Sequence, residues 1–134
     1  MEPVIGLDVA KGKSVIQAFM RRNEVYGKPE TITHDEVGYR RLGSIIQELQ
    51  VRTGEEPVVV LEATGHYHRP VVACLSAIKV SYFIVNPLLS KRTKSAQLRK
   101  VKTDKADAWH LAEMYYRGDV QPHRSWEECY IELQ

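Results

Sequence analysis

The run Val58 to Glu62 constrains the fold more than any other segment of the chain. Pro57 precedes the sequence VVVLE, and such an uninterrupted apolar run is typical of a strand that is buried on both faces. Residues 67–78 have helical character, and VSYFIV, from Val80, predicts a second buried strand. A strand, a helix and a strand in this order normally form a right-handed parallel crossover. We therefore expect residues 58–62 to be a central strand.

The segment before this unit predicts antiparallel strands. Residues 4–10 are apolar and rich in β-forming residues, and residues 14–20 and 24–33 supply two further strands after short turns. The chain is therefore expected to be an α/β domain with a mixed five-stranded sheet, in which three antiparallel strands are followed by parallel strands, flanked by helices.

Two segments predict longer helices. Apolar residues recur at helical spacing through residues 35–52, where Asp35 is a suitable N-cap and Gly54 a stop. The stretch after the last strand predicts a short helix and a loop. A final helix is expected over residues 104–117, ended by Gly118.

Length and composition are those of one folded domain. The chain has 134 residues, of which 43% are hydrophobic and 27% charged, values that are typical of globular domains. We assign residues 1–118 to this domain. Residues 119–134 show no clear periodicity and are expected to be a tail that leads to a further, C-terminal domain.

The cysteines and the apolar runs indicate where in the cell the protein is expected. Cys74 and Cys129 form no CxxC pair, which indicates a reduced, cytoplasmic setting. The longest apolar runs fall well short of the roughly 18 residues that a membrane helix needs, so no membrane contact is expected.

Four acidic residues are the candidate catalytic groups. Asp8 lies inside an apolar strand and Glu62 ends another. Burying an uncompensated carboxylate at such positions lowers the folding stability by roughly several kcal/mol. Asp104 and Asp107 are three residues apart, on one face of a helix start. Magnesium or manganese would compensate such a cluster, since these hard cations prefer carboxylate oxygen and suit phosphodiester cleavage.

A purely structural interpretation remains open for each acid. A single aspartate at the end of a strand often caps the following turn, and acids in the first turn of a helix favour its dipole. His66 and His68 lack further histidines or cysteines nearby that would complete a zinc site.

A basic stretch precedes the last pair of acids. The net charge of the chain is only +2, yet residues 91–105 contain a single acid among several cations. Such a run is either a solvated helix face or a nucleic-acid contact. The candidate phosphate-binding residues are Lys91, Arg92, Lys94, Arg99, Lys100, Lys102 and Lys105.

Four motifs, taken in order, resemble one known family. GLDVAK begins at Gly6, LEATGHYH at Leu61, VNP at Val85 and KTDKADA at Lys102. Together they are similar to the DEDD transposases of bacterial insertion sequences, a family that includes the Piv-type DNA invertases. The resemblance covers residues 4–118.

The resemblance implies a RuvC-like domain of RNase H-like fold. Its acidic tetrad, which falls by motif on Asp8, Glu62, Asp104 and Asp107, would bind Mg²⁺ or Mn²⁺ and act on DNA strands. The resemblance also implies a guide RNA from the same element, a homo-oligomer at full length, and a C-terminal domain with a nucleophilic serine. No serine of this chain matches that nucleophile's motif; the serines considered are Ser14, Ser76, Ser90, Ser95 and Ser125.

Two other functions remain to be weighed. The chain could be a non-catalytic nucleic-acid-binding module whose acids are structural. It could also be half of an actin-like or sugar-kinase ATPase, because GLDVAKGKS resembles a phosphate-binding hairpin. That second alternative requires another glycine-rich phosphate loop, which the sequence lacks.

Overall fold

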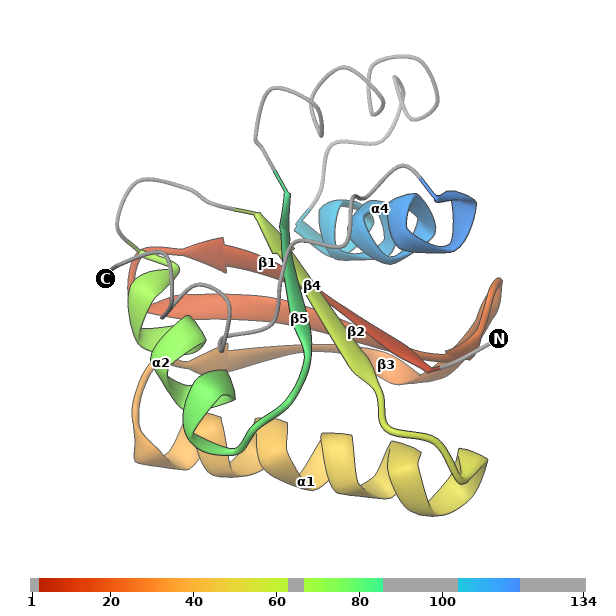
Figure 1. Ribbon diagram of the computed structural model, residues 1–134. Coiled ribbons are helices and arrows are strands. Elements are labelled where there is room, and N and C mark those ends of the chain that lie inside the picture. Colours follow the sequence, from red (N-terminus) through yellow and green to blue (C-terminus); the bar gives the residue numbers. More distant parts are fainter. Residues whose placement is uncertain (1–2, 63–66, 86–103, 119–134) are drawn as a thin grey trace, which may run out of the picture.

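A single mixed sheet forms the centre of the molecule (Figure 1). The computed structural model describes residues 3–62, 67–85 and 104–118, and of residues 104–107 it describes the backbone alone. In this part of the chain five strands pair in the order β3-β2-β1-β4-β5. Helices α1 and α2 cover one face of the sheet and α4 covers the other (Figure 1). The predicted fold class is confirmed.

The first three strands form an antiparallel meander, as expected. They are β1 (Val4–Ala10), β2 (Lys13–Arg21) and β3 (Glu24–Thr33), with Asp8 opposite Val15 in the pairing of β1 and β2. β3 is an edge strand whose pairing with β2 is interrupted twice by register shifts. It contains Pro29, which has no N–H to donate and is tolerated at an edge.

Helix α1 (Glu36–Thr53) has the ends that its sequence predicts. The Asp35 side chain accepts a hydrogen bond of 2.9 Å from the Gly38 N–H, and Gly54 ends the helix in the left-handed conformation. Apolar residues at helical spacing form its buried side: Leu42, Ile45, Ile46 and Leu49. These side chains pack on the sheet together with those of α2.

A parallel crossover follows, made by β4 (Val58–Glu62), α2 (Arg69–Ala77) and β5 (Tyr82–Val85). β4 pairs in parallel with both β1 and β5, so the predicted central strand is confirmed. The prediction that β5 starts at Val80 is wrong. Lys79 adopts a left-handed φ of 59°, and the N–H of Val80 donates to the Leu75 carbonyl, so Val80 still belongs to the end of α2.

Helix α4 (Asp104–Arg117) lies across the other face of the sheet, and Gly118 ends it with a φ of 81°. Its small residues Ala108 and Ala112 face β1, and its aromatic residues flank them. Trp109 packs edge-on against Phe19 at 5.2 Å between ring centroids. The aromatic residues of α4 therefore belong to a second core, separate from the core beneath α1 and α2.

Candidate active site

Asp8 and Glu62 lie side by side at the carboxyl ends of neighbouring strands. β1 and β4 are parallel, with Gly6 beside Val60 and Leu7 beside Leu61. The pairing ends there, and Asp8 and Glu62 are the residues that follow on the two strands. Adjacent strands are about 4.8 Å apart, which brings the two carboxylates within reach of one ion. Both residues are half-buried, and each interacts with another residue of the chain.

The two acids face the same side of the sheet. Strand side chains alternate between faces. Val4 on β1 and Val60 on β4 belong to the core under α4, whereas Leu7 and Leu61 belong to the core under α1. Asp8, four residues after Val4, and Glu62, two residues after Val60, therefore point to the face that α4 covers.

The first turn of α4 points toward these acids. Glu113, in the second half of α4, pairs with Arg22 at 2.7 Å, and Arg22 lies in the β2–β3 turn, next to the start of β1. Ala108, nearer the helix start, lies against Gly6. The helix thus runs antiparallel to β1, and its first turn continues toward the end that carries Asp8 (Figure 1).

Asp104 and Asp107 belong to this first turn of α4. Asp104 opens α4, four residues before Ala108, a rise of about 6 Å at 1.5 Å per residue. Asp8 lies two strand residues beyond Gly6, about 7 Å along β1. The backbone brings the start of α4 alongside Asp8; the Asp104 and Asp107 side chains are outside what is described.

Gly6 is the residue of this site that sequence reasoning missed. A Cβ at Gly6 would lie 1.9 Å from the backbone oxygen of Ala108, so only glycine allows α4 to approach β1 this closely. A glycine inside a strand often marks such a close approach. That signal is present within the GLDVAK motif, but the partner is about a hundred residues away and could not be inferred.

Carboxylates on a common face are the donors that hard divalent cations select. Asp8 and Glu62 are two such half-buried carboxylates, and each also interacts with another residue of the chain. Among the side chains that are described, no three histidine, cysteine or acidic residues form a metal cluster. The side chains of Asp104 and Asp107 lie outside this set.

The predicted basic residues lie almost entirely outside the described residues. Lys105 is in the first turn of α4, with its backbone alone described. The others are Lys91, Arg92, Lys94, Arg99, Lys100 and Lys102, and their contact with nucleic acid stays a prediction.

A hydrogen-bonded serine and histidine lie elsewhere. Ser14 Oγ is 2.7 Å from His34 Nε2, and the His34 ring stacks on Tyr39. Burial lowers the pKa of His34, which the neighbouring Asp35 partly opposes. Ser14 is fully buried, so it is shielded from any substrate and is not a nucleophile.

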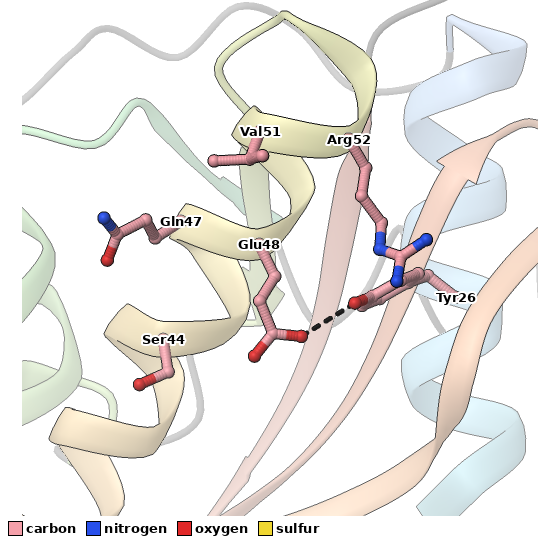
Figure 2. A pocket seen from close by; sticks show the side chains of 6 residues that line it. All are labelled: Tyr26, Ser44, Gln47, Glu48, Val51 and Arg52. Atoms are coloured by element: carbon pink, nitrogen blue, oxygen red, sulfur yellow. Dashed lines mark hydrogen bonds between the residues drawn. The ribbon is translucent and has the colours of Figure 1, made fainter.

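A surface hollow of about 480 Å³ lies between α1 and β3 (Figure 2). The Tyr26 hydroxyl donates to Glu48 at 2.7 Å, and the Arg52 guanidinium lies 5.3 Å from the centre of the Tyr26 ring. The polar groups of Tyr26 and Glu48 are thus paired with each other. The hollow is on the α1 side of the sheet, opposite Asp8 and Glu62.

The sheet order, the helices on both faces and the two strand-end acids define an RNase H-like domain of the RuvC type. Two solved structures are similar to this chain. Thermus thermophilus RuvC in complex with a Holliday junction substrate has a TM-score of 0.55 and 13% identity, over 91% of this chain and 99% of that one. A structure of Thermus thermophilus RuvC has a TM-score of 0.53 and 12% identity, over 90% and 99%. At these identities the likeness shows the fold.

The sequence then identifies the family. The sequence model of the IS110-type DEDD transposases, described as "Transposase", matches residues 5–134. The chain belongs to this transposase family, as its motifs predicted. A search of curated protein sequences gives no significant match. In the part of the chain that is described, no helix is long and apolar enough to cross a membrane.

Proposed function

We propose that this chain is the metal-dependent catalytic domain of a DNA transposase, with Asp8, Glu62, Asp104 and Asp107 as its metal-binding residues. The observation that carries the proposal is the placement of Asp8 and Glu62 on one face of neighbouring parallel strands, with the start of α4 directed toward them. Divalent metal held by these residues would stabilise the negative charge that develops on a phosphodiester during cleavage.

The chain's own residues supply a rigid frame for this chemistry. Asp8 extends from a central strand, paired on both sides, and Glu62 from the adjacent one. Ligands on paired strands are held more precisely than ligands on loops. The acids on α4 complete the set, so the position of α4 on the sheet controls the geometry of the site.

Manganese binding tests the assignment. Asp8→Asn keeps the size of the side chain and removes its charge, and we expect its Mn²⁺ affinity, measured by calorimetry, to fall by more than about tenfold. Asp104→Asn is expected to behave alike. Asp35→Asn is the matched control, because Asp35 is an exposed helix cap on α1, and asparagine caps equally well.

Anomalous scattering from a manganese-soaked crystal locates the ions directly. Peaks between Asp8, Glu62 and α4 would support the proposal. Unchanged Mn²⁺ affinity in Asp8→Asn would instead favour a nucleic-acid-binding module with structural acids.

A guide RNA and a homo-oligomer form part of the same proposal. They are carried over from the motif resemblance described above. Sequencing the RNA that copurifies with the protein tests the first, and light scattering with and without that RNA tests the second.

A further inference from the structure

The turn between β1 and β2 places two lysines beside the acids. Lys11 and Lys13 flank Gly12, whose φ of 73° is the left-handed conformation that closes the turn. The turn is held in place from β3, because the His34 N–H donates to the Gly12 carbonyl at 3.0 Å. It is therefore a fixed feature of the sheet.

Lys13 lies on the same face of the sheet as Asp8. Asp8 pairs directly with Val15, and Lys13 is two residues before Val15 on the same strand, so the three side chains point to the α4 face. Lys13 is the diagonal neighbour of Asp8, a relation in which side chains are about 7–8 Å apart.

This corner of the sheet is open. Lys11 and Lys13 are exposed, Val15 is half-buried, and Thr31, opposite Val15 on β3, is exposed. Phe19, farther along β2, is instead buried beneath Trp109 and Tyr116 of α4. The helix covers one end of β2 and leaves the end next to Asp8 accessible from solvent.

The two lysines are available for a ligand. Among the described residues no ion pair includes Lys11 or Lys13, whereas the arginines at the end of β2, in the β2–β3 turn and near the start of α1 are paired with glutamates. A cluster of carboxylates repels a polyanion. Cations next to the cluster are needed to offset that repulsion and to draw the backbone of a nucleic acid toward it.

We infer that Lys11 and Lys13 form a phosphate-binding site for the DNA strand that enters the active site, crossing the open corner of β2 and β3. The inference rests on the proposed function and adds the path of its substrate. Phosphate contacts of this kind position the nucleic acid and carry no sequence information.

Fluorescence anisotropy with a labelled DNA duplex tests the site, in EDTA so that binding is independent of metal. We expect Lys11→Gln/Lys13→Gln to weaken DNA binding and to reduce the magnitude of the slope of log K against log salt by about 1.8, since each phosphate contact on duplex DNA contributes about 0.9. The matched control is Lys28→Gln/Lys79→Gln. Both control lysines are exposed; Lys28 lines a hollow against α1, and Lys79 ends α2, so both are away from the α4 face.

A reduced slope in the Lys11/Lys13 variant alone supports the site. An unchanged slope overturns it, as does an equal reduction in the control, a failure of the unaltered chain to bind DNA, or an effect of the lysines on RNA alone. Failure of the proposed function is read separately, from Mn²⁺ affinity in Asp8→Asn. If Asp8→Asn loses Mn²⁺ affinity while the Lys11→Gln/Lys13→Gln variant binds DNA normally, the proposed function stands and the lysine site is wrong.

Discussion

Under the proposed function, Gly6→Ala should weaken metal binding by displacing α4. The added Cβ would lie 1.9 Å from the Ala108 oxygen, whereas ordinary contacts begin at 3.4 Å, so α4 and β1 must separate by about 1.5 Å. Metal–ligand distances tolerate only about 0.2 Å. We therefore expect Mn²⁺ affinity to fall by about tenfold to a hundredfold, with about 1–3 kcal/mol lost from the free energy of unfolding.

Substitutions at two other glycines serve as controls that distinguish displacement of α4 from general destabilisation. At Gly38, on α1, a Cβ would lie 1.7 Å from the Thr33 oxygen, an equally severe clash on the opposite side of the sheet. Gly38→Ala should lower stability to a similar degree while the folded protein keeps its Mn²⁺ affinity. Gly43→Ala meets open space and should stabilise the helix by about 0.5–1 kcal/mol.

The assay combines calorimetry with urea unfolding and with tryptophan emission. Trp109 packs on Phe19, and in a Trp126→Phe background it is the sole tryptophan. Its emission should shift to longer wavelength in Gly6→Ala and stay unchanged in Gly38→Ala. The reasoning fails if Gly6→Ala binds Mn²⁺ normally, or if Gly38→Ala loses metal to the same extent.

Two further predictions concern the other face of the sheet. Asp35→Ala should lower the urea midpoint, and Asp35→Asn should restore it, because the Gly38 N–H needs a side-chain acceptor; equal midpoints for both variants would show that the cap is dispensable. The lowered pKa of His34 means that the unfolded chain binds a proton more readily. The free energy of unfolding should be highest above pH 6.5 and decrease as the pH falls from 6.5 toward the lowered pKa. His34→Gln should reduce this decrease, and an identical decrease in both proteins would rule out His34 as its source.

Elements with local signals were predicted well from the sequence. Asp35 and Gly54 mark the ends of α1 through chemistry contained within a few residues, and Gly118 does the same for α4. Val80 was assigned wrongly to β5, since a lysine with a left-handed φ, rather than a glycine, precedes it at the end of α2. The left-handed conformation of Lys79 is imposed by the end of the helix, and no residue pattern in the sequence predicts it.

The strand-end positions of two candidate acids were predictable from the sequence, but their arrangement was not. Asp8 and Glu62 could be recognised as acids at the ends of apolar runs. Their common face depends on the register between β1 and β4, which periodicity along a single strand does not specify. The approach of α4 to Gly6 depends on contacts between distant segments, and these are set by packing rather than by local propensity.

The late position of α4 in the chain has a consequence for biosynthesis. The sheet with α1 and α2 has its own core, complete by residue 85, and domains form from the N-terminus as synthesis proceeds. Until α4 leaves the ribosome, Val4, Phe19 and Val60 remain exposed as an aggregation-prone apolar surface. During that interval Asp8 and Glu62 lack the acids of α4, so under the proposed function the nascent protein cannot cut DNA before α4 has been translated.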